Sequence, residues 1–398
     1  MKILIATPIL YDPPSPFNHL MRDILQGLLD AGHEVTRIVA AESADDTAYT
    51  MGLDGIRYIP ILRKKSEKAN IIKRYLTDTL TALRMAKAIK AADADVLFED
   101  VCYSSFWCVR AAKKKRLQVV SMLQDVWPDN AVQSGLISEG SLIYRYFEYW
   151  QRKVYALSDR LICISDDIKA FIAQKGVSPD KIDVIYNWGY SDEPVNIPRE
   201  DNAFLKKYEL DPQTFYAIYA GNIGRMQNVE LIIEAATRLR ENEHIRFLII
   251  GDGVKADEIR AAAADLPNVT MLPLQPSELA TAIYSAAGVN LIPLVEGGVK
   301  TALPSKTGVV LSCGRPAIFC FGDDSAFAAA VNEYGAGMTV SATDPAPLAA
   351  AIADLAANES EAPCHGATAL FLDRFTRSVN VKRYEECITN NVEATGNG

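Results

Sequence analysis

Two segments of the chain combine glycine, hydroxyl and basic residues in a pattern that is typical of phosphate binding. The first, Tyr219 to Asn228, follows an apolar run and opens a helical pattern. Glycines let a backbone approach a ligand closely, and a helix N-terminus offers free N–H groups and a positive dipole end to an anion. Arg225 adds a guanidinium fork for phosphate oxygens. A plain tight turn would use the same glycines, but the position after a strand favours a phosphate site.

The second segment, Glu296 to Thr307, lies between another apolar run and another helical pattern. Pro304 suits a first helical turn, which places Ser305 and Lys306 at the start of a helix. A cation at this end opposes the helix dipole, so an anion bound beside Lys306 explains the residue better than helix stability does. The alternative is a solvated surface lysine.

A third segment, Gln124 to Asn130, gathers an aromatic ring and two carboxylates just after a predicted strand. Loops at strand ends often carry function, although Asp and Pro are also common turn residues. The segment therefore predicts either a binding site around Asp125 and Trp127 or an ordinary turn. Asn187 and Trp188 follow a later strand in the same way, and the alternative for them is a hydrophobic plug at the domain junction.

Basic residues are concentrated between Arg57 and Lys90, where ten basic and two acidic side chains give a net charge of +8. A second basic cluster runs from Lys113 to Arg116. Each basic residue near an anionic bilayer contributes about 1 kcal/mol of binding free energy. The segment predicts contact with an anionic membrane surface, and the alternative is a solvated helix face.

Several other kinds of chemistry are excluded by what the sequence lacks. The four histidines (His19, His33, His244 and His365) are far apart and show no metal-ligand spacing. There is no GxSxG elbow, no Walker lysine motif, and no GxGxxG after the first apolar run. The seven cysteines are scattered without CxxC spacing, which favours a reducing cytoplasm.

Length and charge set the scale of the fold. With 398 residues and 49% hydrophobic composition, the chain is long enough for about two domains with sizeable cores. Its net charge of −9 argues against a protein that coats nucleic acid. The first 200 residues are net neutral and the remainder carries the whole −9, so each half has its own electrostatic character. No apolar run approaches the roughly 18 residues of a membrane span.

The elements that position the candidate residues alternate between short β-branched runs and longer helical patterns, which is typical of parallel sheets built from βαβ units. Ligands bind at the carboxyl ends of such strands, and the cleft between two facing domains is the expected site. The sequence therefore predicts an α/β protein with two Rossmann-like, doubly wound domains. The predicted strands are 2–7, 34–39, 57–61, 95–98, 118–122, 160–164, 181–185, 215–220, 245–250, 269–272, 289–293, 317–319 and 337–340.

The domain boundaries follow from where this periodicity fails. Residues 187–213 are rich in Asp, Glu, Asn and Pro, which is typical of a linker. A last helical pattern, from about Arg377 to Asn391, follows the last strand and is expected to cross back to the first domain. We predict an N-terminal domain over 1–190, a linker over 191–213, a C-terminal domain over 214–376 and a returning helix over 377–398.

Taken together, the motifs resemble those of the GT-B glycosyltransferases of family 4 over nearly the whole chain. Each motif is weak alone, but their order and spacing extend over about 300 residues. They are the N-terminal strand with its Pro-rich turn, Ala31 to Val35, Ile162 to Ser165, Val184 to Trp188, Gly221 to Asn228, Ile249 to Gly253, Ala302 to Thr307 and Gly314 to Pro316.

The resemblance implies a nucleotide-sugar donor held mainly by the C-terminal domain, an acceptor held mainly by the N-terminal domain, retention of anomeric configuration, and no metal or other cofactor. The branch it is most similar to contains bacterial enzymes that add acetamido sugars to lipid-linked carriers of surface polysaccharide such as O-antigen or capsule. We therefore expect a UDP-N-acetylhexosamine or a deoxy derivative as donor, a polyprenyl-diphosphate-linked saccharide as acceptor, and a cytoplasmic enzyme at the inner face of the cell membrane.

Residue roles follow from the same resemblance. Charge on the departing diphosphate would be stabilised by Arg225 and Lys306, with Asp125 on the transferred sugar or acceptor hydroxyl. The other expected donor contacts are Gly221, Asn222, Gly224, Gln227, Glu296, Lys300 and Ser305; the nucleotide would contact Gly251, Asp252 and Leu272; and the acceptor would contact Asn18, Trp127 and Asn187.

The chain departs from the family pattern at defined positions. The family's glutamate pair falls on Thr301 and Val309, and Glu296 could replace only the first. The usual basic pair of the phosphate loop falls on Asn222 and Gln227, and Lys300 with Lys306 could restore the charge. These departures keep two alternatives open, a catalytically silent GT-B subunit that binds or scaffolds a partner and a nucleotide-sugar epimerase, which would need converging acid/base residues.

Overall fold

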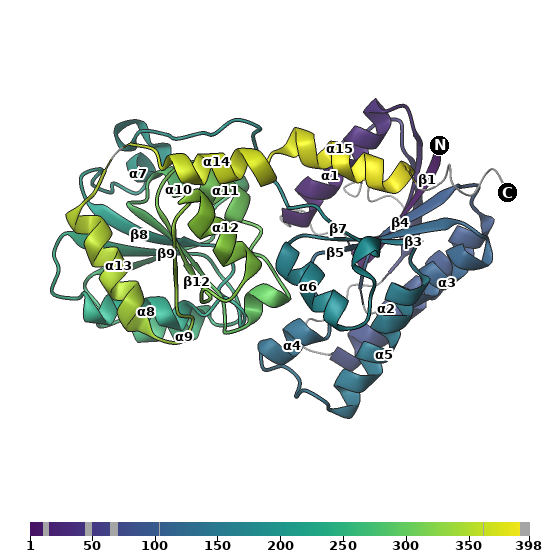
Figure 1. Ribbon diagram of the computed structural model, residues 1–398, viewed down its shortest axis with the longest axis horizontal. Helices are drawn as coiled ribbons and strands as arrows, with labels where there is room; N and C mark the ends of the chain where they lie inside the picture. Colours follow the sequence, from purple (N-terminus) through teal and green to yellow (C-terminus); the bar gives the residue numbers. More distant parts are fainter. Residues whose placement is uncertain (11–15, 44–49, 64–70, 103, 361, 391–398) are drawn as a thin grey trace. The chain divides into compact units, whose positions relative to one another are not determined.

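The protein divides into two compact units in a computed structural model that describes residues 1–10, 16–43, 50–63, 71–102, 104–360 and 362–390 (Figure 1). The first unit comprises Met1–Asp129, Ser138–Tyr186 and Ser378–Gly398, and the second comprises Asn130–Ile137 and Asn187–Arg377.

A seven-stranded parallel sheet forms the centre of the first unit, in the order β3-β2-β1-β4-β5-β6-β7. Its central strands are almost entirely buried because helices cover both faces, which explains their near-continuous apolar runs. The strands are β1 (Lys2–Leu10), β2 (Glu34–Ala41), β3 (Arg57–Leu62), β4 (Val96–Asp100), β5 (Gln118–Leu123), β6 (Arg160–Cys163) and β7 (Ile182–Val184).

Helices cover the two faces of this sheet. Helices α2, α3 and α5 pack side by side over one face, where the buried core includes Leu97, Met85 and Val109 (Figure 1). On the other face, α15 packs against the sheet through Tyr384, whose ring lies 6.0 Å from that of Phe98. The helices are α1 (Pro16–Asp30), α2 (Ile71–Ala91), α3 (Phe106–Lys114), α4 (Asp129–Gln133), α5 (Leu142–Leu157), α6 (Asp166–Gln174) and α15 (Arg377–Thr389), with a short 3-10 helix at Pro179–Lys181.

The second unit repeats the architecture with a six-stranded parallel sheet in the order β10-β9-β8-β11-β12-β13. In both sheets the order reverses beside the first strand of the unit, β1 or β8, which is the switch point where open α/β sheets bind ligands. The strands are β8 (Phe215–Ala220), β9 (Ile245–Ile250), β10 (Val269–Leu272), β11 (Val289–Pro293), β12 (Ala317–Cys320) and β13 (Met338–Val340).

Two helical layers enclose this second sheet. Helices α8, α9 and α13 pack on one face, and α10, α11, α12 and α14 form the opposite layer (Figure 1). The helices are α7 (Ala203–Lys207), α8 (Val229–Arg238), α9 (Ala256–Ala263), α10 (Ala280–Ser285), α11 (Thr307–Ser312), α12 (Ala326–Tyr334), α13 (Pro345–Ala357) and α14 (His365–Arg374), with 3-10 helices at Arg199–Asp201, Ser277–Leu279 and Gly298–Lys300.

The sheet architecture confirms the predicted α/β class, whereas the segment predicted as a linker is folded. Within 191–213, Asn202 caps α7 by accepting hydrogen bonds from the N–H groups of Phe204 (3.0 Å) and Leu205 (3.2 Å). Both of those side chains are buried, and the buried Arg199 pairs with Glu359. A five-residue helix is too short to show periodicity, so its packing could not be read from the sequence. Among the described residues, no helix is long and apolar enough to cross a membrane.

Candidate functional site

The loop after β8 lies in direct contact with the loop after β9. Gly221 donates its N–H to the carbonyl of Ile250 (2.8 Å), and Ile223 donates to the carbonyl of Asp252 (2.8 Å). A Cβ at Gly251 would lie 1.9 Å from the carbonyl oxygen of Gly221, so only glycine fits at that position. The predicted phosphate loop is thus braced by β9, and the N–H groups of Gly221 and Ile223 are already used.

Lys306 immediately precedes α11, and its side chain points toward this loop. Its Nζ would lie 3.0 Å from a Cβ at Gly221, and it sits 3.8 Å from the ring centroid of Tyr219. The stem of the side chain keeps some solvent contact, but the Nζ atom is enclosed and has no hydrogen-bond partner within the described part of the chain. Burial lowers the pKa of this amino group to about 7.

This enclosed amino group has a clear chemical meaning. A buried ammonium without a partner is unfavourable, and an anion placed beside Gly221 would remove that penalty. Lys306 and the loop after β8 therefore come together as a candidate anion site. The sequence predicted both components, but the enclosure of the amino group could only be seen in the structure.

The remaining residues of the loop lie around this position. Asn222 donates a hydrogen bond from its amide nitrogen to Gln227 (3.2 Å), and a Cβ at Gly224 would meet both of these side chains. Arg225 is exposed, with no hydrogen bond or ion pair to any described residue, so its guanidinium is available to a ligand. Ser305 is also exposed beside Lys306.

Lys300 and Glu296 line a hollow that Lys306 does not line. Lys300 forms an ion pair with Asp324 (3.3 Å), while Glu296 is exposed. Both line a hollow of about 500 Å³ with residues that follow β12 and β13, including Asp323 and Ser341. The charge of Lys300 is therefore already paired within the protein, which weakens its predicted role in replacing a phosphate-binding cation.

The two positions where the family pattern has glutamates are buried in this chain. Thr301 is fully buried and donates its hydroxyl to the side chain of Gln133. Val309 is buried in α11. Because both positions are buried, an ionised carboxylate at either one would carry a desolvation penalty.

The predicted nucleotide contacts gather at one edge of the second sheet. Gly251 follows β9 and donates its N–H to the carbonyl of Leu272 (3.0 Å), the last residue of β10. Asp252 is exposed next to Gly251, and its carboxylate accepts from the N–H of Gly253 (2.8 Å). These residues lie beside the phosphate loop, on the carboxyl edge where a nucleotide would extend from it.

A second polar cluster lies at the carboxyl edge of the first sheet. Asp100 ends β4 and is buried, and the pKa of its carboxyl is raised to about 8 by burial and then by the charge of Asp125. Asp125 is exposed at the surface, and the protein atoms around its carboxyl raise the pKa of that group to about 6. Thr7 of β1, the strand that pairs with β4, is buried, and its hydroxyl has no partner among the described residues.

Asp100 was not predicted as a site residue. The run Val96 to Asp100 ends in two carboxylates at the end of a buried strand, and that was the available signal. Its neighbour Glu99 points to the opposite face of the sheet, where burial and the charge of Asp100 raise its pKa well above the usual range.

The other predicted acceptor residues are distributed between the two units. Trp127 packs edge-on against Phe147 with ring centroids 5.3 Å apart, and Asn18 is half-buried on α1. Asn187 is buried and belongs to the second unit rather than to the N-terminal domain predicted over 1–190. Within the described ranges, no group of three or more His, Cys, Asp or Glu residues is arranged to hold a metal ion.

Comparison with known families decides the class of the protein. Residues 18–188 match the model of Glycosyltransferase Family 4, and residues 214–358 match that of Glycosyl transferases group 1. The two matches together span most of the chain. The chain belongs to the family 4 glycosyltransferases.

Relatives and solved structures agree with this assignment. The glycosyltransferase is 26% identical over 274 residues to a protein named as a probable glycosyltransferase, WbjE of Pseudomonas aeruginosa, covering 68% of this chain and 67% of that protein. It is 26% identical over 212 residues to WcaI of Escherichia coli K12, which carries the name of a colanic acid biosynthesis glycosyl transferase; the match covers 52% of each chain.

The fold of the glycosyltransferase is GT-B. HepE of Anabaena, solved in complex with UDP, superposes with a TM-score of 0.71 at 15% identity, covering 98% of this chain and 100% of that one. The resemblance to family 4 and the predicted fold are therefore confirmed.

Proposed function

We propose that this glycosyltransferase moves a sugar from a UDP-sugar to a lipid-linked saccharide during assembly of a surface polysaccharide, with retention of anomeric configuration. The observation that carries the proposal is the enclosed amino group of Lys306 beside Gly221. Two comparisons support the finer details. HepE binds UDP in its solved complex, and the name of WcaI refers to the biosynthesis of a polysaccharide.

The anion site explains how the chain would promote departure of the nucleotide. As the bond between the anomeric carbon and the phosphate oxygen breaks, negative charge develops on the diphosphate. Lys306 is already enclosed at the loop, so it would stabilise that charge without reorganising. The exposed Arg225 would add a second cation. The backbone N–H groups of Asn222 and Gly224, which donate to no described residue, would donate to phosphate oxygens.

The acceptor side of the proposal rests on the polar cluster at the end of β4 and β5. Asp125 keeps solvent access and would accept a hydrogen bond from the attacking acceptor hydroxyl. Asp100, buried behind it, would hold a proton at neutral pH and so limit the repulsion between the two carboxyls. We expect Trp127, Asn18 and Asn187 to contact the acceptor saccharide.

The donor sugar and the cellular location complete the proposal. We expect an N-acetylhexosamine or a deoxy derivative as the sugar and a polyprenyl-diphosphate carrier as the acceptor, with the enzyme at the inner face of the membrane. Of the predicted basic segment, Arg57, Arg84, Lys87 and Lys90 are exposed, whereas Arg63 is buried against Asp78. Lys64, Lys65 and Lys68 lie outside the described residues.

The test is a transfer assay with a panel of UDP-sugars and a polyprenyl-diphosphate-linked saccharide. Lys306→Ala should lower kcat at least about a hundredfold, as is typical when one preorganised electrostatic contact is lost. Lys206→Ala, which removes an exposed lysine of α7, is the matched control and should keep full activity. NMR of the product identifies the anomeric configuration. Wild-type turnover by Lys306→Ala would contradict the assignment.

A catalytically silent subunit is the second candidate, and one observation favours it. The two positions where the family places glutamates hold the buried Thr301 and Val309. A thermal-shift screen separates the candidates when it is combined with the assay, because a ligand of the native state raises the melting temperature. A silent subunit would be stabilised by UDP and would neither transfer nor hydrolyse any donor of the panel.

A further inference from the structure

We propose that the outer face of α2 and α5 is a docking surface for the headgroup region of an anionic lipid bilayer. This interfacial face consists of seven exposed apolar or aromatic residues, namely Leu76, Leu80, Leu83, Leu142, Ile143, Tyr146 and Tyr149. It deepens the lipid-linked acceptor of the proposed function, but vesicle binding can be measured without donor or acceptor. The two proposals can therefore fail separately.

Helix α2 is apolar on both of its sides. Its inner side buries Ala82, Met85 and Ile89 against the sheet, as expected for a covering helix. Its outer side carries Leu76, Leu80 and Leu83, each at least 41% exposed, at the i, i+4, i+7 spacing that places them in one row. A helix that faces only water would carry polar residues in that row.

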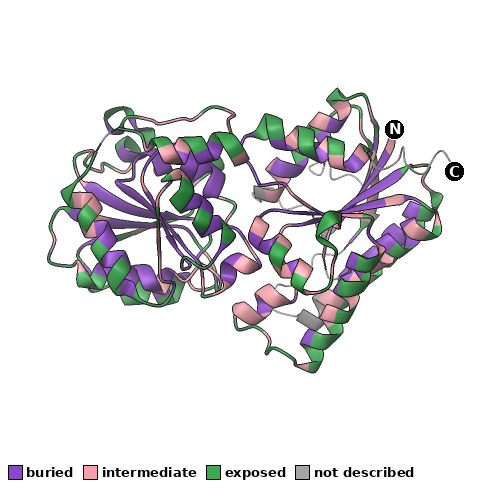
Figure 2. Ribbon diagram, in the orientation of Figure 1, coloured by how far each residue is buried: buried purple, intermediate pink, exposed green. Residues whose placement is uncertain are grey.

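Helix α5 continues this apolar surface. Leu142 and Ile143 begin the helix and are 83% and 57% exposed, and Tyr149 lies further along on the exposed side. The hydroxyls of Tyr75 on α2 and Tyr146 on α5 are 2.6 Å apart, which joins the two helices at the surface. Figure 2 shows exposed residues along the outer sides of both helices.

Half-buried aromatic rings lie under and beside the interfacial face. The ring of Trp150 is 5.2 Å from that of Tyr149 and 4.6 Å from that of Phe106 on α3, with Trp107 close by at 6.2 Å. Trp and Tyr are enriched where proteins meet the headgroup layer, because their rings are apolar and their N–H and O–H groups are polar. This composition fits a bilayer better than an ordinary solvated surface.

The charge around the face identifies its partner. The single carboxylate of α2, Asp78, is buried and neutralised by Arg63 at 2.8 Å, so no acid remains on the outer side of the described helix. Arg84, Lys87 and Lys90 are exposed there. Such a surface attracts anionic lipid headgroups.

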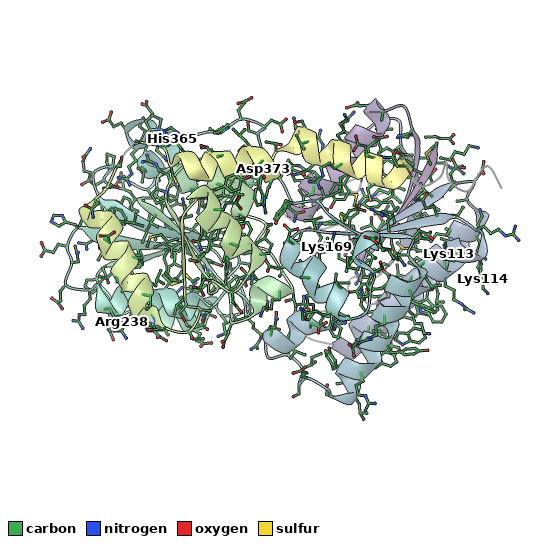
Figure 3. The ribbon with its side chains drawn as sticks, viewed as in Figure 1. Lys113, Lys114, Lys169, Arg238, His365 and Asp373 are labelled. Atoms are coloured by element: carbon green, nitrogen blue, oxygen red, sulfur yellow. The ribbon has the colours of Figure 1, made fainter. Side chains whose placement is uncertain are left out.

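More basic residues border the face on α3 and α5. Figure 3 labels Lys113 and Lys114 at the end of α3; Lys113 pairs with Asp159, and Lys114 is exposed. Arg145 and Lys153 are exposed on α5. A second copy of this chain would bring the same positive charges into opposition, which favours lipid over self-association as the occupant.

Flotation of the full-length protein with vesicles tests the apolar part of the surface. Wild-type protein should bind vesicles of phosphatidylglycerol and phosphatidylcholine and should bind pure phosphatidylcholine much more weakly. The double variant Leu142→Ser, Ile143→Ser should reduce the partition coefficient at least about tenfold, because two buried aliphatic groups are lost. The control is Leu372→Ser with Val379→Ser, which removes two exposed apolar residues from α14 and α15 and should leave binding unchanged.

Charge variants test the electrostatic part. Replacing Arg84, Lys87 and Lys90 by Gln should reduce binding to anionic vesicles roughly a hundredfold at low salt, at about 1 kcal/mol for each charge. The control replaces three exposed basic residues elsewhere, Lys206, Arg240 and Lys382, and should retain binding. Circular dichroism and the melting temperature verify that each variant is folded.

The proposal would be overturned by wild-type protein that remains unbound at all anionic lipid contents, or by equal losses in the interfacial and control variants. Sedimentation velocity adds a further decisive outcome. If the wild type is a dimer that does not bind vesicles, and Leu142→Ser with Ile143→Ser makes it monomeric, the face is an interface between copies and the lipid assignment is wrong.

Discussion

The amino group of Lys306 destabilises the unliganded protein, because it is enclosed without a hydrogen-bond partner in the described part of the chain. Lys306→Met keeps most of the apolar stem and removes the charge. We predict that this variant is more stable than wild type by about 1 kcal/mol or more in urea unfolding at pH 7 without nucleotide. A large loss of stability would show that Lys306 stabilises the fold, and it would contradict the assignment of Lys306 as an anion-binding residue.

The pH dependence of stability gives a second signature of the same residue. Its folded-state pKa is about 7, below the ordinary 10.5, so the unfolded state binds more protons between these values. The contribution of Lys306 to stability is therefore lost as pH falls from about 10.5 to about 7. We predict that the stability advantage of Lys306→Met over wild type shrinks as pH rises from 7 to 9.5, measured by urea unfolding at each pH.

The contribution of Asp100 to the pH dependence of stability should have the opposite sign. Its pKa is raised to about 8, so its contribution to stability is complete below about pH 4 and is lost as pH rises through 8. Asp100→Asn removes this loss, and we predict that the variant gains stability relative to wild type between pH 5 and pH 8.5. The same variant should lower transfer activity while leaving UDP affinity unchanged. Loss of UDP affinity would contradict the placement of Asp100 on the acceptor side.

Among the elements, the contact between the loops after β8 and β9 should be the most sensitive to a single added methyl group. Gly251→Ala would place a Cβ 1.9 Å from the carbonyl of Gly221, so the phosphate loop must move. We predict a destabilisation of at least about 2 kcal/mol and loss of most UDP binding.

A second glycine provides the matched control for this element. Gly335 ends α12 with a φ of +62° and would have no atom within 4 Å of an added Cβ. Gly335→Ala should cost about 1 kcal/mol in backbone strain and leave UDP affinity unchanged. Equal effects of the two substitutions on UDP binding would show that the contact between the loops is unimportant.

The strands could be predicted because strands that are buried on both faces of a sheet have near-continuous apolar sequences. Even the three-residue β7 lies within its predicted range. Packing between distant residues could not be predicted. Thr301 bonds Gln133, which is 168 residues away, and Lys300 is neutralised by Asp324. The burial of Asp100 and the enclosure of Lys306 depend on such packing. Asp100 was therefore not predicted as a site residue.

At the scale of the whole molecule, each unit has its own sheet and its own core. The core of the second unit gathers residues from β8, β9 and β11, including Tyr219 and Ile249. The candidate donor residues all belong to this unit, whereas Asp100 and Asp125 belong to the first. We therefore propose that the second unit binds the donor.

Hydrogen–deuterium exchange measured by mass spectrometry can test whether the second unit binds the donor. We predict that saturating UDP slows amide exchange in 219–228 and in 303–309, because the ligand orders both segments of the anion site. Exchange in β4 and β5 should remain at the unliganded rate. Protection confined to the first unit would contradict the assignment of nucleotide binding to the second unit.

We propose that Lys306 and the loop after β8 bind the diphosphate of the donor. The most direct test is the affinity for UDP at pH 7, measured by isothermal titration calorimetry for wild type, Lys306→Met and Lys206→Met. We predict that Lys306→Met weakens binding by about tenfold or more, as expected when a charge-assisted contact is lost, while Lys206→Met binds like wild type. Equal Kd values for all three proteins would contradict the claim.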